Sequence, residues 1–317
     1  MVHWTFDDIP DQTGRIAVVT GANTGIGFET ARMLAQKGAR VVLACRTPEK
    51  GEAAALRIAA TRPVGSATFA PLDLSDLDSV AAFASAIAAA HPRLDLLVNN
   101  AGVMVPPLSR TKQGFELQFG TNHLGHFVLV NRCAPLMGAG ARLVNLASSG
   151  HRFSNVDLDD PNFAQTPYDP FVAYGRSKTA NILFARAFDE RHRSRGVRAT
   201  AVHPGGIQTE LGRHMDDSQL DGMIEKMNEQ LAAEGKAPFQ WKTIPQGAAT
   251  SVWAGVVAPA EAVGGRYCEN CHVGEIVADD VVISAISEGV RGYALDLANA
   301  LALWEKSEEM VGESFPA

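Results

Sequence analysis

Tyr174 and Lys178 stand four positions apart in the sequence, a spacing that brings two side chains onto one face of a helix. A free tyrosine has a pKa of about 10 and is a poor base near neutral pH. A nearby ammonium group stabilises the phenolate and lowers this pKa toward the working range. The pair therefore predicts a tyrosine acid/base catalyst held active by lysine, but the spacing is common and the pair needs partners.

Ser148 and Asn122 are the predicted partners. Ser148 follows the strand-like run 142–147, so its hydroxyl can hydrogen-bond a substrate carbonyl at the end of that strand. Asn122 lies in a helix expected at about 113–137, and its place in the chain order suits a residue that steadies water or backbone near Lys178. Asn100 closes another apolar run, 94–99, at the same predicted crevice.

A glycine-rich turn, TGANTGIG at residues 20–27, joins the apolar run 16–19 to a helix expected over 26–36. Glycines allow the backbone to approach a pyrophosphate, and a helix N-terminus supplies free N–H groups and a favourable dipole. The strand–turn–helix context predicts a dinucleotide cofactor, with a purely structural turn as the alternative. The positive nicotinamide ring of that cofactor would reinforce the effect of Lys178 on Tyr174.

Arg46 follows the second strand-like run, 41–44, where dinucleotide folds often place an acid for the ribose 2′-hydroxyl. An arginine at this point can hold the 2′-phosphate of NADP in a bidentate manner. The sequence therefore predicts a preference for NADP(H), with NAD(H) as the second cofactor. The alternative is an exposed arginine without a ligand.

Apolar runs and helical patterns alternate along the chain. The expected strands cover 16–19, 41–44, 67–72, 94–99, 142–147 and 197–203, and a late strand is entered at 264–267; the expected helices cover 26–36, 48–60, 77–90, 113–137 and 174–192. Continuous apolar runs are typical of a parallel sheet covered on both faces. The pattern predicts one α/β domain over residues 1–317, a Rossmann-type doubly wound sheet of about seven strands flanked by helices.

Two segments, residues 150–173 and 210–245, interrupt the alternation of expected strands and helices. The second carries helical spacing of apolar residues, at Leu220, Met223, Ile224, Met227 and Leu231. Both are candidates for a substrate lid, and the alternative is surface decoration.

The composition excludes some classes of protein. A net charge of −7 argues against a nucleic-acid partner, and no stretch approaches the ~18 apolar residues of a membrane span. The acidic start, with Asp7, Asp8 and Asp11, is unlike a signal peptide, so a cytoplasmic location and reduced cysteines are expected. Residues 268–272 (CENCH) match a haem-attachment pattern, but attachment would need export, and neither this segment nor the scattered histidines predicts a metal site.

With these motifs in place, the chain resembles the short-chain dehydrogenase/reductase family over about residues 14–300. The motifs that carry the resemblance are TGANTGIG, NNAG at 99–102, Asn122, Ser148 and Y-x-x-x-K at 174–178, all in family order. The stretches GANTGIGFETARMLAQKGARVVLACRTPEKGE, NHLGHF and SKTANILFARA resemble the retinol dehydrogenase-like branch.

The resemblance implies a dehydrogenase/reductase acting on CH–OH groups, which exchanges a carbonyl and an alcohol by hydride transfer. Tyr174 would be the acid/base, Lys178 would bind the nicotinamide ribose, Ser148 would orient the substrate and Asn122 would serve a proton relay. The expected cofactor contacts are Gly21, Asn23, Thr24, Gly25, Ile26, Gly27, Arg46, Asp73, Leu74, Asn100, Ala101, Gly102, Tyr174, Lys178, Pro204, Gly205, Ile207 and Thr209.

Some questions stay open at this point. The family chemistry also allows reduction of an activated carbon–carbon double bond, and a non-catalytic dinucleotide sensor is a further alternative. The loop before Tyr174 carries Phe153, Phe163, Tyr168 and Phe171, which suits either a cover for a bulky apolar substrate or a packed surface excursion. Family members are often dimers or tetramers, so a homo-oligomer is an open expectation.

Overall fold

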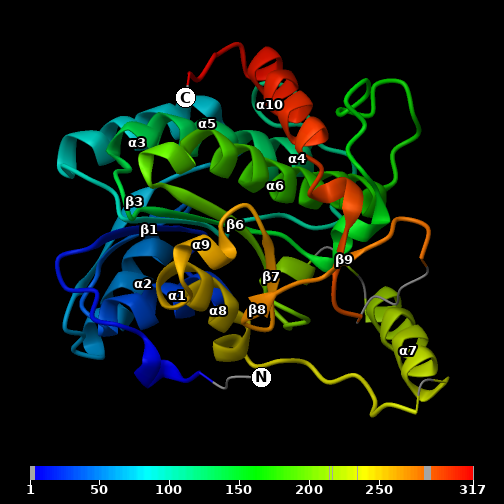
Figure 1. The fold of residues 1–317 in the computed structure, drawn as a ribbon, viewed down its shortest axis with the longest axis horizontal. Helices are drawn as coiled ribbons and strands as arrows, with labels where there is room; N and C mark the ends of the chain where they lie inside the picture. The colour runs from blue at the N-terminus through cyan, green and yellow to red at the C-terminus, as the bar shows by residue number, and fades with distance from the viewer. Residues whose placement is uncertain (1–3, 214, 216, 234, 282–286, 317) are drawn as a thin grey trace.

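The structure, a computed structural model, describes residues 4–213, 215, 217–233, 235–281 and 287–316. Its centre is a mostly parallel sheet (Figure 1). The strand order is β3-β2-β1-β4-β5-β6-β7-β8, and only the last pair is antiparallel. The strands are β1 (Ile16–Thr20), β2 (Arg40–Cys45), β3 (Ser66–Pro71), β4 (Leu96–Asn99), β5 (Arg142–Leu146), β6 (Arg198–His203), β7 (Tyr267–Glu269) and β8 (His272–Val273). A separate parallel pair joins β9 (Ile276–Val277) to β10 (Val290–Arg291).

Helices cover both faces of the sheet. They are α1 (Gly25–Gln36), α2 (Pro48–Ala60), α3 (Leu77–Ala90), α4 (Leu117–Phe119), α5 (Gly125–Cys133), α6 (Pro170–His192), α7 (Asp217–Ala233), α8 (Ile244–Val252), α9 (Ala260–Val263) and α10 (Leu297–Val311). Successive strand residues point to opposite faces. Val18 therefore joins the core beneath α3, α5, α6 and α10, whereas Ala17 and Val19 join the core beneath α1, α2 and α8. Figure 1 shows these two helical layers on either side of the sheet.

The predicted fold is confirmed, with differences in detail. The main sheet has eight strands rather than about seven, because a tight turn through Asn270 and Cys271, both with positive φ, folds β8 back onto β7. The predicted late strand is β7. The single helix expected at 113–137 is wrong: a π-helical turn, Gly120–Leu124, separates α4 from α5.

Helix α6 begins four residues earlier than expected because Asp169 caps it. The Asp169 carboxylate accepts the N–H groups of Phe171 and Val172, and Pro170 occupies the first helical turn, where its missing N–H is not needed. This long helix packs against β5 and β6 and carries Tyr174 and Lys178, with Lys178 at the carboxyl end of β5.

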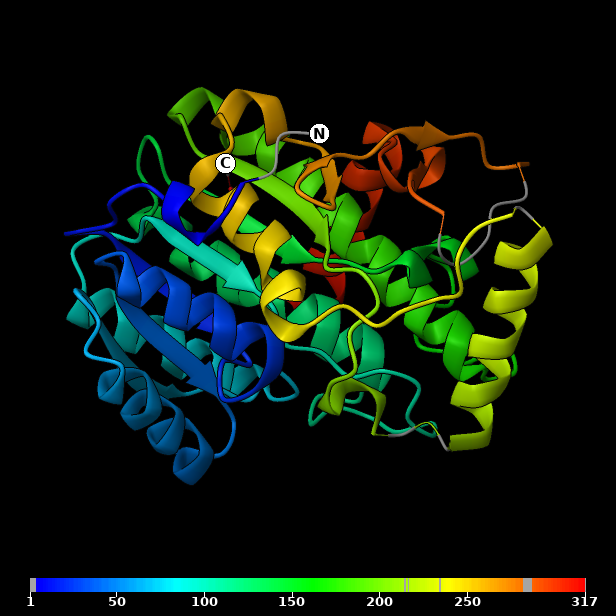
Figure 2. The same ribbon diagram turned by 90° about the horizontal axis from the view of Figure 1, so that it is seen from below.

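The two interrupting segments have different structures. Residues 154–169 form a loop held by its own hydrogen bonds: Asp160 accepts the N–H groups of Ala164, Gln165 and Thr166. The second segment contains α7, which confirms the helical spacing expected there. Figure 2 shows α7 standing at the side of the molecule, away from the helical layers of the sheet.

Candidate active site

The glycine-rich turn is fixed by Asn100 at the end of β4. The side-chain amide of Asn100 donates to Thr20 O at 2.8 Å, across the mouth of the turn. A Cβ on Gly27 would lie 2.4 Å from this amide nitrogen, and one on Gly21 would lie 2.9 Å from Ala101 Cα. Only glycine fits at these two positions, so the turn keeps its backbone open to a ligand.

Residues 204–209 (PGGIQT), called the P-G segment from here on, follow β6 and face this turn. Gly25 has φ +57°, and a Cβ placed there would lie 3.5 Å from Thr209 Cγ2. Thr24, Gly25 and Thr209 border one cavity of about 370 Å³, together with Gln208, Glu210 and Ile244. Ile26 and Ile207 both approach Gly247 of α8. The structure thus brings Thr24, Gly25 and Ile26 of the turn close to Ile207 and Thr209, whereas Pro204 and Gly205 directly follow β6, and a Cβ on Gly205 would meet Lys242.

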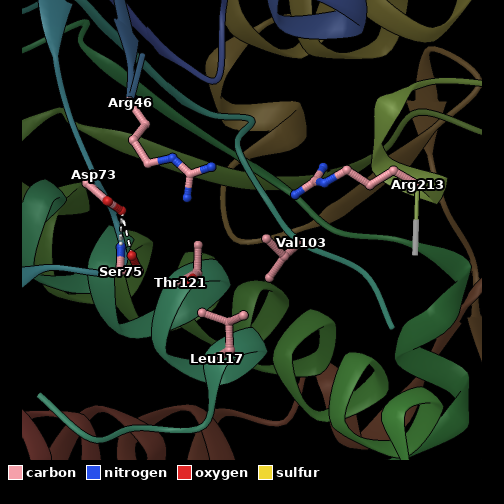
Figure 3. A pocket seen from close by; sticks show the side chains of 7 residues that line it. All are labelled: Arg46, Asp73, Ser75, Val103, Leu117, Thr121 and Arg213. Atoms are coloured by element: carbon pink, nitrogen blue, oxygen red, sulfur yellow. Dashed lines mark hydrogen bonds between the residues drawn. The ribbon is translucent and has the colours of Figure 1, made fainter. Parts of the chain in front are cut away.

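A second cavity, of about 270 Å³, lies beside the ends of β2 and β3 (Figure 3). Its lining residues are Arg46, Asp73, Ser75, Val103, Leu117, Thr121 and Arg213. Asp73 keeps its carboxylate turned toward Ser75, whose N–H and hydroxyl donate to it at 2.9 and 2.6 Å. Leu74 points its side chain into the core and is only 6% exposed, which leaves its backbone for any contact with a cofactor.

Tyr174 lies buried against the Ser148 turn. The backbone of Gly150 passes so close to the ring that a Cβ there would lie 2.7 Å from Tyr174 Cε1. Ser148 forms a side-chain hydrogen bond with Tyr174, and its Oγ accepts the N–H of Gly150 at 3.0 Å. Burial raises the pKa of Tyr174 to about 12, while the hydrogen bond to Ser148 opposes that rise.

Lys178 lies one helical turn from Tyr174, as the spacing predicted. Its Nζ donates to Leu146 O at 3.1 Å and lies 5.6 Å from the centre of the Tyr174 ring. Burial lowers the pKa of Lys178 to about 8. The expected lowering of the Tyr174 pKa by Lys178 is not seen in the protein alone, because the desolvation of the phenol is the largest effect on that group.

Asn122 connects this pair to the cofactor side of the site. Its Oδ1 accepts the N–H of Val103 at 2.8 Å, and its Nδ2 donates to Val103 O and to Ser177 Oγ, each at 2.9 Å. A Cβ on Gly102 would lie 3.2 Å from Asn122 Oδ1 and 3.6 Å from Lys178 Nζ. Asn122 therefore fixes the loop after β4 against α6, at the point where Gly102 leaves room beside Lys178.

His126 was missed by the sequence reasoning. Its Nδ1 lies 2.9 Å from Asn122 O and its Nε2 lies 2.9 Å from Thr20 Oγ1. Burial lowers the pKa of His126 to about 4, so the ring is neutral. The available signal was its spacing of four residues from Asn122 in the predicted helix, which places both on one face.

His151 holds the Ser148 turn from the other side. Its Nδ1 lies 2.6 Å from Ser148 O, and its Nε2 accepts the N–H of Arg291 at 3.2 Å. Tyr293 donates its hydroxyl to His151 O at 2.7 Å. The segment after β10 is thereby attached to the turn that carries Ser148.

The CENCH segment spans β7 and β8. Cys268 is buried on β7, Cys271 lies in the following turn, and all four cysteines are free. Within the described ranges, no group of three or more His, Cys, Asp or Glu side chains is arranged to hold a metal ion. No helix in the described part of the chain is both long and apolar enough to cross a membrane.

Comparison with known proteins decides the family. A family model described as short chain dehydrogenase matches residues 15–220. The chain belongs to this family. As a short-chain dehydrogenase it is an oxidoreductase that uses a nicotinamide dinucleotide and acts on CH–OH groups.

Two curated relatives and two solved structures illustrate the likeness. This short-chain dehydrogenase is 42% identical to Retinol dehydrogenase 12 of Mus musculus over 260 residues, 81% of this chain and 78% of the relative. It is 42% identical to a probable oxidoreductase of Streptomyces lividans over 298 residues, 93% and 97% of the two chains. The retinol dehydrogenase-like resemblance is thus confirmed.

Among solved structures, an uncharacterized protein from Mycobacterium paratuberculosis is 32% identical, with a TM-score of 0.76 over 99% of both chains. A protein from Beutenbergia cavernae, described as an NAD(P)-dependent gluconate 5-dehydrogenase with bound NADP, is 27% identical, with a TM-score of 0.62 over 81% of this chain and 95% of that one.

Proposed function

We propose that this short-chain dehydrogenase interconverts a carbonyl compound and its alcohol with NADP(H), using Tyr174 as the acid/base. The observation that carries the proposal is that the Tyr174 ring and the Ser148 hydroxyl converge beside the buried Lys178: a Cβ on Gly150 would lie 2.7 Å from Tyr174 Cε1 and 3.4 Å from Ser148 Oγ. A phenol and a hydroxyl that share one carbonyl oxygen can bind it and protonate it. A purely structural tyrosine would not need this second hydroxyl at its polar end.

Each residue has a proposed part in the reaction. A bound nicotinamide cofactor supplies or receives the hydride. Tyr174 donates its proton to the carbonyl oxygen as the alcohol forms and takes it back in the reverse direction. Ser148 accepts the Gly150 N–H at its Oγ, and its hydroxyl proton, which favours the Tyr174 phenolate in the protein alone, turns to the substrate oxygen when a carbonyl binds. Lys178 binds the nicotinamide ribose, and Asn122 serves the proton relay near Lys178.

Two positive charges would favour the phenolate when alcohol is oxidised. Lys178 supplies one, and the ring of the oxidised cofactor supplies the second. Because burial holds the pKa of Tyr174 at about 12 in the protein alone, the second charge is expected to bring it down when the cofactor binds.

The preference for NADP(H) rests on Arg46. Its side chain enters the cavity at the ends of β2 and β3, and Asp73 in that cavity is already hydrogen-bonded to Ser75. The site therefore offers an arginine rather than a free acid to the adenosine ribose. The bound NADP of the Beutenbergia cavernae relative supports the same choice. NAD(H) is proposed as a weaker cofactor.

A bulky apolar substrate is proposed from two aromatic pairs beside the site. Phe153 and Phe171 meet edge to face at 6.0 Å, and Phe153 packs on Gly175, the neighbour of Tyr174. Phe239 and Trp241 meet at 4.9 Å and cover Gly206 in the P-G segment. Retinol, the alcohol in the name of the mouse relative, is of this apolar class.

The apolar side of α7 supports the same substrate class. Leu220, Met223, Ile224 and Met227 are only partly buried, although they share one face of the helix. We propose that α7 and the Phe153–Phe171 pair form the substrate lid, while residues 154–169 are a packed surface excursion. Location in the cytoplasm and assembly into a homo-oligomer stay predictions of the sequence.

The test is Tyr174→Phe in the full-length protein, with NADPH and a panel of apolar aldehydes and ketones. The variant is expected to bind NADPH as the wild type does and to lose nearly all turnover. Product analysis in the wild type then separates alcohol formation from reduction of a carbon–carbon double bond. Turnover retained by the variant, or a wild type that binds NADPH and reduces no member of the panel, would overturn the proposal.

A further inference from the structure

Arg213 lies across the second cavity from Arg46. Figure 3 shows the two guanidinium groups extending toward one another from opposite walls, above Val103 and Thr121. Arg46 comes from the end of β2, whereas Arg213 follows the short 3-10 turn Glu210–Gly212 after the P-G segment. Two like charges that face each other in one cavity repel, so their arrangement favours an anion between them.

Among the described residues, neither arginine has a carboxylate partner. In the part of the chain that the structure describes, no carboxylate forms an ion pair with Arg46 or Arg213. Asp73 borders the same cavity, but its carboxylate accepts from Ser75. One N–H of Arg213 donates to Glu210 O at 2.9 Å, which holds the side chain on its own turn. A guanidinium has five N–H donors, so the Arg213 side chain has four more that can bind a ligand.

We infer that Arg213 is a second arginine for the 2′-phosphate of NADP(H), opposite Arg46. The inference rests on the proposed function, since it places that cofactor in the cleft. A 2′-phosphate carries up to two negative charges and three acceptor oxygens, so it can pair with two guanidinium groups at once. Recognition then comes from two distant parts of the chain, and the sequence motifs identify only Arg46.

The first experiment measures the dissociation constants of NADPH and NADH separately, by nucleotide fluorescence with the purified full-length protein. Arg213→Gln is expected to weaken NADPH binding about tenfold and to leave NADH binding within about twofold, because the removed charge-assisted hydrogen bonds meet only the 2′-phosphate. Arg213→Lys should lie in between, since it keeps the charge and loses the bidentate geometry. Lys226→Gln, an exposed charge on α7, is the matched control and should leave both constants unchanged.

A second measurement uses fragments that differ in one phosphate group. Adenosine 2′,5′-bisphosphate should compete with NADPH more weakly in Arg213→Gln than in the wild type, whereas competition by 5′-AMP should not change. Equal losses for both nucleotides, or for both fragments, would place Arg213 elsewhere on the cofactor and overturn the inference. An unchanged NADPH constant would overturn it as well. Failure of the proposed function would look different, because the wild type would then bind NADPH without reducing any carbonyl of the panel, would keep turnover in Tyr174→Phe, or would bind NADH more tightly than NADPH.

Discussion

The hydroxyl of Thr20 and the imidazole of His126 meet at 2.9 Å beneath the cofactor-binding face of the sheet. Thr20 Oγ1 also accepts the N–H groups of Asn100 and Ala101, each at 2.9 Å. Because Asn122 O can only accept, His126 Nδ1 carries the proton, and Nε2 receives the Thr20 hydroxyl. One chain of buried hydrogen bonds therefore connects the end of β1, the loop after β4 and the carbonyl of Asn122.

The Thr20–His126 bond is expected to contribute to stability as a pair. His126→Phe removes the acceptor of the Thr20 hydroxyl proton, and Thr20→Val leaves the buried His126 Nε2 without its donor, so each should lower the free energy of unfolding by about 1–3 kcal/mol. The double variant should be destabilised by less than the sum of the single losses, since it removes both ends of the bond. Urea unfolding of the four proteins measures this coupling. Additivity to within about 0.5 kcal/mol would show that the two side chains act independently.

Ser148 and Ser149 offer a matched pair of variants. Ser148 hydrogen-bonds Tyr174, whereas Ser149 begins the following turn, and both are partly buried. Ser148→Ala is expected to lower kcat about 100-fold, a typical loss for one oriented polar group in an active site. Ser149→Ala should stay within about threefold of the wild type, as expected for a residue without a part in orienting the substrate. Steady-state kinetics with one aldehyde decides between them, and a larger loss in Ser149→Ala would reverse the assignment.

Gly150 tests how precisely the Tyr174 ring must be placed. An alanine Cβ at this position would lie 2.7 Å from Tyr174 Cε1, so the ring or the turn must shift. A displacement of about 1 Å in a catalytic group can cost 100-fold in rate, and Gly150→Ala should lose most of its kcat. Gly138→Ala is the control, because nothing lies within 4 Å of its added Cβ. If kcat were the same in both variants, the close contact would have no role in positioning Tyr174.

The sequence predicted the positions of most strands and the residues of the candidate active site, but not all contacts between them. Continuous apolar runs located β1, β2, β4 and β5 to within a few residues, because strands buried on both faces have no polar alternation. The residues of the Tyr174–Lys178 pair and Ser148 were predicted from spacing and order, and the structure brings them together.

Apolar runs, residue spacing and motif order could not predict contacts between segments that are distant in the sequence. Arg213 follows the 3-10 turn Glu210–Gly212, which no motif identifies, and only the folded chain places it in the same cavity as Arg46. In the sequence His126 is an ordinary helical histidine, because its contact with Thr20 forms only when β1 and α5 pack together. The π-helical turn at Gly120–Leu124 was missed because its composition suits an α-helix equally well.

Buried histidines are expected to make the protein acid-sensitive. Burial lowers the pKa of His123 to about 3, those of His126, His151 and His192 to about 4, and that of His203 to about 3. Below about pH 6.5 these histidines become protonated in the unfolded chain but stay neutral in the folded chain. The free energy of unfolding should therefore fall steadily as the pH drops from 6.5 toward 4.

His123→Phe isolates one of these groups. The His123 ring packs among Phe119, Phe127 and Phe184, so a phenyl ring suits the site, although the hydrogen bond to Ser307 is lost. The Ser307 hydroxyl keeps its bond to Leu303 O at 2.7 Å, and the substitution removes the buried His123 Nδ1, which has no partner among the described residues, so the free energy of unfolding at pH 7 should change by no more than about 1 kcal/mol. Because the variant has one titrating group fewer, its stability relative to the wild type should rise between pH 6.5 and 5. Urea unfolding at both pH values measures it, and a constant difference would mean that His123 does not titrate on unfolding.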